Sequence, residues 1–326
     1  MTVSRVINGH PGVRPETRVA VEDAIRVLGY TPNVAARSLV KSAELRIGVV
    51  YSNPSAAFMS EFLTGVFEEA SARGVRLILL KGENGQPPAR PALTKLVQSG
   101  VAGVILAPPL SEAPAVLEVL RKAHMPMAAV GAYAVTDAIC VRIDDRAAAY
   151  EMTRHLLDLG HRRLGFILGN PDQAASTERL SGFYAAVRER SDVATVMAQG
   201  DFSYHSGLEA GEQLLDTPSP PTAVFASNDD MAAALVSVAH RRHLDVPGEL
   251  TVAGFDDTHA AVMLWPPLTT VHQPVRRLAS EALGLLVARI AAENTTAGLQ
   301  PDHVFDHTLI KRESTSPMPQ LVDGEG

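Results

Sequence analysis

The chain has 326 residues, of which 46% are hydrophobic and 20% charged, and its formal net charge is −7. This length exceeds that of one typical domain and allows large hydrophobic cores, as in an ordinary globular protein. The single cysteine, Cys140, excludes an intrachain disulfide and any metal site built from several cysteines. No stretch approaches the roughly 20 apolar residues of a membrane span, and the first 20 residues lack an export signal. We therefore expect a cytoplasmic protein that does not enter a membrane.

Three short helical patterns follow one another at the start of the chain. The first covers residues 1–8, the second runs from Pro15 to Gly29, and the third follows Asn33, which is suited to be its N-cap. Helices this short are not stable alone, so together they form a small bundle or dock on a partner.

The start of the chain is basic, whereas the rest is acidic. Residues 1–46 hold seven Lys or Arg against four Asp or Glu, so this stretch carries +3 and the remaining chain carries −10. A basic head on an acidic body favours an anionic partner such as nucleic acid. On charge alone, a solvated helical surface explains the same pattern equally well.

After Leu45, short apolar runs alternate with amphipathic helical patterns. The runs that predict strands are residues 46–50, 76–80, 103–107, 127–130, 139–143, 164–168, 223–226 and 250–253. The patterns that predict helices are residues 59–73, 91–98, 112–123, 146–159, 178–190, 206–215, 230–242 and 275–292. Continuous apolar strands interleaved with helices predict an α/β fold with parallel sheets covered on both faces. Two strand-to-helix stretches, 47–54 and 164–171, share a plan, so we expect two doubly wound sheets with a ligand cleft between them.

Four blocks near the start resemble the DNA-binding head of the lactose-repressor (LacI/GalR-type) regulators. They are Thr2-Val-Ser-Arg-Val-Ile-Asn-Gly, Pro15-Glu-Thr-Arg, Leu28-Gly-Tyr-Thr-Pro-Asn and Ala36-Arg-Ser-Leu39. Further blocks resemble the effector domain of the same family: Gly160-His-Arg-Arg, Phe225-Ala-Ser-Asn-Asp, Val252-Ala-Gly-Phe-Asp-Asp257 and Pro266-Pro-Leu-Thr-Thr-Val-His-Gln-Pro274. The resemblance implies a transcription repressor that binds operator DNA as a homodimer. It also implies that a small-molecule effector, a sugar or sugar derivative, controls DNA binding.

In this family the first pattern is the recognition helix and the third is the hinge helix. The resemblance assigns DNA contacts to six side chains: Thr2, Ser4, Arg5, Asn33, Arg37 and Leu39. The family's head begins with one more helix and a turn, which brace the recognition helix in the major groove. This sequence begins inside the recognition helix. We therefore expect a head truncated within the helix-turn-helix (residues 1–30), a hinge helix and linker (31–45) and impaired operator binding.

The effector domain of the family has the fold of periplasmic sugar-binding proteins, in which the chain crosses three times between two subdomains. The resemblance implies a first subdomain at residues 46–144 plus about 272–298. The second subdomain would cover residues 145–271 plus about 299–313, with a last strand near 303–310. The polar tail at residues 314–326 is expected to be disordered.

Five side chains match effector contacts of the family: Arg179, Asp256, Asn228, Phe202 and Phe58. Arg179 and Asp256 would bind sugar hydroxyls, and Phe202 would stack on the sugar ring. Three of the five have a structural alternative. Arg179 could be a surface arginine at a helix start, Asn228 could form a local turn, and Phe202 could belong to the core.

Catalysis finds little support in the sequence. His240 and His243 have helical spacing, but a third metal ligand with suitable spacing is missing. The acidic pairs at 144–145, 229–230 and 256–257 follow strands, where neighbouring side chains point apart and make poor acid–base couples. Motifs for a phosphate-binding loop or a serine nucleophile are absent. We expect no enzyme activity, no metal and no cofactor. The main alternative is a cytoplasmic sugar-binding protein without a DNA role, and a sugar-metabolising enzyme ranks third.

Overall fold

The computed structural model describes residues 45–83, 85–133, 135–292 and 302–318, together with Thr17. The chain divides into two units, Met1–Glu44 and Leu45–Gly326, and the helices and strands from β1 to β12 belong to the second. Apart from Thr17, the predicted truncated head lies outside the described residues, as do the hinge helix and the six DNA-contact candidates. These candidates are Thr2, Ser4, Arg5, Asn33, Arg37 and Leu39.

The first subdomain is built on a parallel sheet of six strands in the order β11-β5-β4-β3-β1-β2. The strands are β1 (Arg46–Tyr51), β2 (Arg76–Lys81), β3 (Gly103–Leu106), β4 (Met127–Val130), β5 (Ile139–Ile143) and β11 (Asp302–Phe305). Because side chains alternate along a strand, Ile47 and Val49 of β1 pack on one face and Val50 packs on the other.

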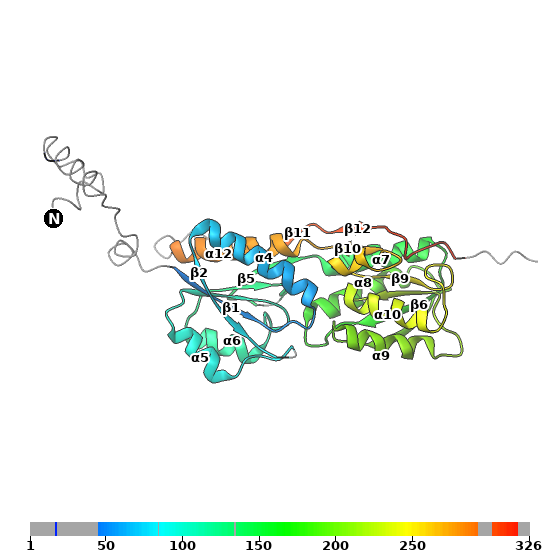
Figure 1. The fold of residues 1–326 in the computed structure, drawn as a ribbon, viewed down its shortest axis with the longest axis horizontal. Coiled ribbons are helices and arrows are strands. Elements are labelled where there is room, and N and C mark those ends of the chain that lie inside the picture. The colour runs from blue at the N-terminus through cyan, green and yellow to red at the C-terminus, as the bar shows by residue number, and fades with distance from the viewer. Residues whose placement is uncertain (1–16, 18–44, 84, 134, 293–301, 319–326) are drawn as a thin grey trace, which may run out of the picture. The chain divides into compact units, whose positions relative to one another are not determined.

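Helices cover both faces of this sheet (Figure 1). On one face lie α4 (Ala56–Arg73) and α12 (Val275–Ala291), and on the other lie α5 (Arg90–Gln98) and α6 (Pro114–Lys122). The ends of α4 follow from its sequence. Ser55 is its N-cap, with Oγ accepting a hydrogen bond from Phe58 N at 3.2 Å, and Gly74 closes it at φ 66°.

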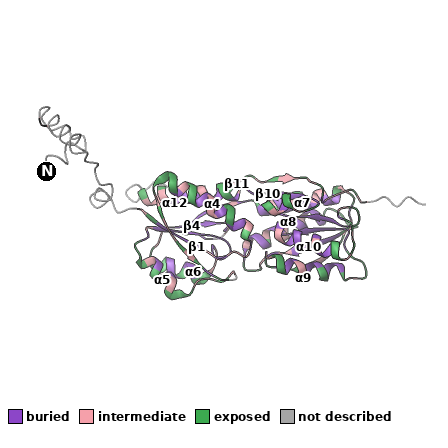
Figure 2. Cartoon of the chain, in the orientation of Figure 1, coloured by how far each residue is buried: buried purple, intermediate pink, exposed green. Residues whose placement is uncertain are grey.

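The second subdomain has a parallel sheet of four strands in the order β7-β6-β8-β9. The strands are β6 (Arg163–Leu168), β7 (Ala194–Gln199), β8 (Ala223–Ala226) and β9 (Thr251–Ala253). One face carries α7 (Asp145–Asp158) and α8 (Ala174–Val187), and the other carries α9 (Tyr204–Leu215) and α10 (Asp229–Arg241). Figure 2 shows the buried residues on the strands and on the inner sides of these helices.

Three connections join the two subdomains. They follow β5, β10 (Thr270–His272) and β11, and β12 (Thr308–Ile310) pairs antiparallel with β10. A short helix, α11 (His259–Met263), precedes β10. The α/β class with two parallel-sheet subdomains is therefore confirmed.

The prediction that the last strand belongs to the second subdomain is wrong for its first half. Residues 302–305 form β11, which pairs parallel with β5 at the edge of the first sheet. The two side-chain oxygens of Asp302 receive hydrogen bonds from Arg142 at 3.1 and 2.7 Å, which fixes this pairing in register. Only β12 lies beside the second subdomain, where it contacts α7.

The prediction of a disordered tail is wrong for residues 314–318. Ser314 is buried, its Oγ donates to Val252 O at 2.6 Å, and the same oxygen accepts from Thr269 N at 2.8 Å. Met318 N donates to Leu159 O at 2.8 Å. These bonds satisfy backbone groups of Val252 in β9, of Thr269 and of Leu159 at the end of α7. Residues 319–326 lie outside the described residues.

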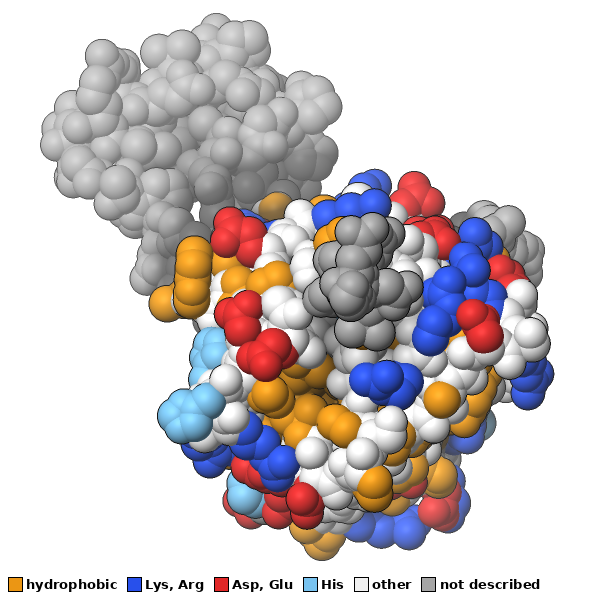
Figure 3. All heavy atoms as spheres, turned by 90° about the vertical axis from the view of Figure 1, so that its right-hand side faces the viewer, with side chains coloured by type: hydrophobic (Ala, Val, Ile, Leu, Met, Phe, Trp, Pro, Cys, Tyr) orange, Lys and Arg blue, Asp and Glu red, His pale blue; other side chains and the backbone are white. Residues whose placement is uncertain are grey.

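The surface at the end of the second subdomain is mixed in character. Figure 3 shows acidic, basic and hydrophobic side chains interspersed on this face.

No helix in the described part of the chain has the length and apolar character needed to cross a membrane.

Candidate functional site

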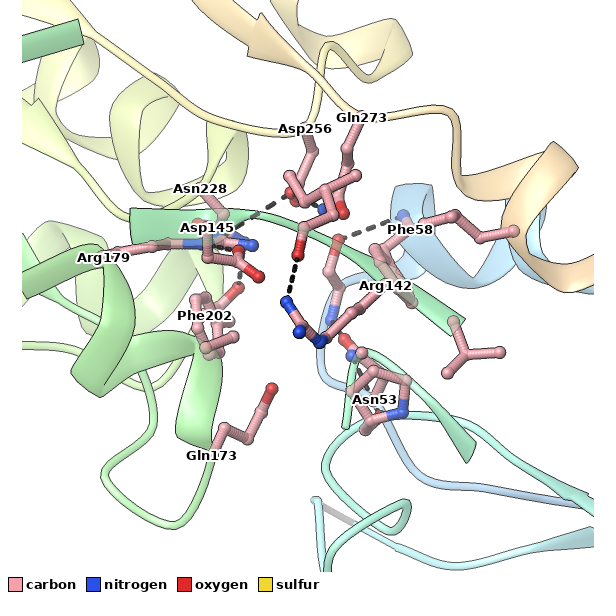
Figure 4. A pocket seen from close by; sticks show the side chains of 17 residues that line it. Asn53, Phe58, Arg142, Asp145, Gln173, Arg179, Phe202, Asn228, Asp256 and Gln273 are labelled. Carbon is pink, nitrogen blue, oxygen red and sulfur yellow. Dashed lines mark hydrogen bonds and ion pairs between the residues drawn. The ribbon is translucent and has the colours of Figure 1, made fainter. Parts of the chain in front are cut away.

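A cavity lies between the subdomains, beside the segments that follow the carboxyl ends of strands in both sheets (Figure 4). Ligands of open parallel-sheet proteins collect at such edges. The empty space among the lining side chains is about 540 Å³, a figure that includes the part open to solvent. All five predicted effector residues line it: Phe58, Arg179, Phe202, Asn228 and Asp256. The structure brings these side chains together, and effector binding by each remains a prediction.

Arg179, in the first half of α8, is the central cation of the cavity. Its Nε donates to Asp145 Oδ1 at 2.8 Å and its Nη1 donates to Ser227 O at 2.5 Å. Its guanidinium carbon lies 3.6 Å from the centre of the Phe255 ring, where cation–π attraction adds to the hydrogen bonds. With 5% of its surface exposed, Arg179 is a buried residue, so the alternative of a surface arginine is wrong.

Asp256 follows β9 and lies opposite Arg179. Its Oδ1 accepts a hydrogen bond from Gln273 Nε2 at 2.5 Å and is 3.8 Å from Arg179 Nη1. Burial raises the pKa of the Asp256 carboxyl to about 7, although Arg179 and Gln273 act to lower it. Desolvation prevails because the carboxyl is almost fully enclosed and the guanidinium is not in direct hydrogen-bond contact. Near neutral pH this carboxyl can thus donate as well as accept a hydrogen bond.

The raised pKa of Asp256 predicts a pH dependence of stability. The usual value is 3.8 and the folded value is about 7, so between these limits the folded state binds the additional proton. The stabilisation from this proton is complete below the unfolded-state pKa of 3.8 and is lost as the pH rises through the folded-state pKa of about 7. Asp256→Asn keeps the shape of the side chain and an acceptor for Gln273. We expect this variant to remove the decrease of the unfolding free energy with pH that Asp256 causes, which is at most about 1.4 kcal/mol per pH unit.

Urea unfolding at about pH 5 and about pH 8 measures the slope. Asp137→Asn is the control, because Arg121 lowers the pKa of the Asp137 carboxyl below its usual 3.8, so this group is ionised in both states between pH 5 and pH 8 and its replacement should leave the slope unchanged. If wild type and Asp256→Asn lose stability equally over this range, the assigned titration is wrong.

Asp145 is a cavity residue that the sequence did not single out. Its neighbour Asp144 caps α7, with Oδ1 accepting from Ala147 N at 2.9 Å. The two carboxylates point apart, and Asp145 faces the cavity with 3% of its surface exposed. It holds Arg179 through Oδ1 and accepts from Tyr133 Oη through Oδ2 at 2.7 Å. The sequence indicates only that Asp144 and Asp145 follow a strand. The fold is needed to show that Asp145 is the one whose side chain points into the cavity.

Asn228 and Phe202 combine local and cavity roles. Asn228 caps α10, with Oδ1 accepting from Met231 N at 2.9 Å, and its Nδ2 donates to Phe202 O at 2.8 Å. Both ends of its amide are thus used by the protein, which supports the structural alternative for this residue. Phe202 has φ 74° and is 6% exposed, and its ring centre lies 5.7 Å from the Arg179 guanidinium carbon.

Gln173 is a second residue that the sequence did not single out. It precedes α8, lines the cavity and is 6% exposed. Among the described residues, its Nε2 has no hydrogen-bond partner. A buried unpaired donor is costly, so a ligand acceptor at this point would restore a lost hydrogen bond. Arg142 and Gln273 also line the cavity and also went unpredicted.

The fold and the cavity define a class of proteins in which two parallel-sheet subdomains close on a small molecule. Residues 153–315 match the model of the periplasmic binding protein-like domain, and residues 1–33 match that of the bacterial regulatory proteins of the lacI family. The chain is 31% identical over 319 residues to catabolite control protein A of Priestia megaterium, covering 96% of this chain and 95% of that protein. The chain therefore belongs to the LacI family of DNA-binding transcription regulators.

Two solved structures support this assignment. The transcriptional regulator CelR–cellobiose complex is 32% identical with a TM-score of 0.75, covering 95% of this chain and 94% of that chain. The lac repressor dimer bound to operator and the anti-inducer ONPF is 25% identical with a TM-score of 0.80, covering 97% of this chain and 94% of that chain. In sequence, the similarity to the family covers the effector unit and residues 1–33 alike.

Proposed function

We propose that this protein represses transcription under the control of a sugar or sugar derivative bound between the subdomains. The observation that carries the proposal is the cavity itself, which joins buried hydrogen-bonding groups to an aromatic wall. Sugars present hydroxyl groups around their edges and C–H groups on their faces, so they require both kinds of surface. The structural relative CelR was solved with cellobiose, which makes a β-linked glucose disaccharide or its monosaccharide unit a reasonable first ligand.

Each lining residue has a distinct task in this proposal. Arg179 donates to a hydroxyl through the part of its guanidinium that Asp145 and Ser227 leave free. Asp256 accepts from a hydroxyl or donates to a ring oxygen, and Gln173 supplies the unpaired donor. Phe202 and Phe58 cover the C–H faces, and Asn228 shapes the wall while it holds Phe202 in place.

Control of DNA binding follows from population shift. The effector touches both subdomains, so it favours the arrangement in which the cavity is closed. The arrangement of the subdomains then determines whether two hinge helices can form side by side on the operator. Within this proposal the DNA contacts are those of Thr2, Ser4, Arg5, Asn33, Arg37 and Leu39. The protein acts in the cytoplasm as a homodimer, without turnover of its ligand and without a cofactor.

Calorimetry of the purified chain against a sugar panel that includes cellobiose, glucose and ribose tests the proposal. We expect one sugar to bind in the micromolar range and to lose about ten-fold in affinity in Gln173→Leu, because that variant removes one hydrogen-bond donor. Gln86→Leu, outside the lining residues, serves as the matched control. A panel without any binding sugar, or a binder equally tight in Gln173→Leu, would contradict the assignment.

A further inference from the structure

Glu112 joins the two subdomains through one carboxylate. It lies in the segment between β3 and α6, in the first subdomain, where its Oε1 accepts a hydrogen bond from Tyr133 N at 2.9 Å. Its Oε2 accepts from Ala174 N at 3.0 Å, and Ala174 is the first residue of α8 in the second subdomain. Glu112 and Tyr133 are not among the residues that line the cavity.

The bond to Ala174 supplies what the start of α8 lacks in its own sequence. The first turn of α8 is Ala174-Ala-Ser-Thr, which holds no acidic residue, and among the described residues the N-cap Gln173 makes no side-chain capping bond. The first N–H groups of a helix need acceptors, and a negative charge beside them is favourable. Glu112 provides both from the opposite subdomain, so the contact requires the two subdomains to be as close together as they are in this structure.

The carboxylate is also linked to the centre of the cavity through Tyr133, whose backbone N binds Glu112 and whose side-chain hydroxyl binds Asp145. Tyr133 Oη donates to Asp145 Oδ2 at 2.7 Å, and Asp145 Oδ1 accepts from Arg179 Nε at 2.8 Å. Burial and the neighbouring Asp145 raise the pKa of the Tyr133 hydroxyl, so it keeps its proton and remains the donor. Glu112 therefore fixes both the backbone of Tyr133 and the start of α8, next to Gln173.

We propose that Glu112 is a positioning residue that latches the closed cleft and holds Gln173 toward the effector. This inference rests on the proposed function, since it concerns the same cavity. Glu112 does not touch the effector. Its two hydrogen bonds raise the fraction of molecules whose cleft is closed, and the apparent affinity for the effector rises with that fraction. A second bridging contact, from Tyr133 Oη to Asp145 Oδ2 at 2.7 Å, does not involve the Glu112 carboxylate. Loss of the latch should thus loosen closure without unfolding the chain.

The ligand-free test uses the full chain and the variants Glu112→Ala and Glu112→Gln. Glutamine has the size of glutamate but only one acceptor oxygen, so it can serve one of the two amides. Glu118→Ala is the matched control, since Glu118 is an exposed glutamate that pairs with Arg90 and Lys122 within the first subdomain.

Hydrogen exchange of the Ala174 amide and the radius of gyration in small-angle scattering are the two ligand-free readouts. We expect Glu112→Ala to exchange this amide roughly ten-fold faster and to have a larger radius of gyration, with Glu112→Gln in between and Glu118→Ala unchanged. An equal exchange rate and an equal radius in wild type and Glu112→Ala would overturn the latch.

Titration with cellobiose adds the functional readout. If wild type binds cellobiose, we expect about a ten-fold loss of affinity in Glu112→Ala, which corresponds to about 1.4 kcal/mol. Unchanged affinity alongside faster exchange would overturn the link between the latch and effector binding. If wild type does not bind cellobiose, the choice of sugar fails, while amide exchange and scattering still decide on the latch.

Discussion

Replacing Arg179 with alanine should produce the largest loss of stability of any single change at the cavity, about 3–5 kcal/mol. The substitution leaves Asp145 and Asp256 buried without their cation and deprives Ser227 O of a donor. It also removes the influence that lowers the pKa of Asp256, so that pKa should rise beyond about 7. Urea unfolding measures the loss, which should be smaller at lower pH because protonation of Asp256 relieves part of the unpaired charge.

Arg179→Lys is the informative companion variant. Lysine keeps the positive charge but cannot reproduce the planar fork that reaches Asp145 and Ser227 together. We expect an intermediate stability and a loss of effector affinity close to that of Arg179→Ala. A stability of Arg179→Ala within about 1 kcal/mol of wild type would show that the two carboxyls do not depend on this cation.

Substituting Trp265 should convert the homodimer that we propose to monomers. Trp265 and Met263 expose 73% and 77% of their surface and, with Val262, form an apolar patch at and after α11. On the first subdomain, Phe67 and Leu79 are also exposed. Exposed apolar side chains of this size mark interaction surfaces, and a two-fold dimer places the same patch on both copies.

Light scattering at micromolar concentration tests this surface. A central tryptophan typically contributes about 2–4 kcal/mol to an interface, so we expect Trp265→Ala to weaken the dimer by roughly 30-fold to 1,000-fold. Val304→Ala is the control, because Val304 is equally apolar and 52% exposed but belongs to β11. A Trp265→Ala chain that stays dimeric under dilution would place the interface elsewhere.

The sequence was sufficient to predict most of the secondary structure. Strands at 127–130, 139–143 and 223–226 are found at the predicted bounds, because the first and last are continuous apolar runs buried on both faces and the middle one is interrupted only by Arg142. The strand β7 was not predicted. It lies at the edge of its sheet, where only Ala198 is buried, and its sequence Ala-Thr-Val-Met-Ala-Gln holds no continuous apolar run of four or more residues.

Tertiary relationships were harder to predict than the elements themselves. The strand at 302–305 was expected, but its sheet was not, because a short edge strand of polar and apolar residues fits either sheet equally well. At the site, the resemblance to the family named five residues that the structure places around one cavity. Asp145 and Gln173 were missed, because their roles depend on side-chain direction and on an unpaired donor, neither of which a sequence displays.

The hydrophobic core does not stop at the boundary between the subdomains. One cluster of buried side chains runs from Ile47 of β1 through Met152 of α7 to Phe225 of β8, and Val271 of β10 belongs to it as well. In addition, each subdomain is assembled from segments that are far apart in the chain. Neither half can therefore be excised as an autonomous folding module, and thermal melting of the effector unit should be one cooperative event. Fusing the effector unit to another DNA-binding head consequently requires the whole of residues 45–318 as one continuous segment.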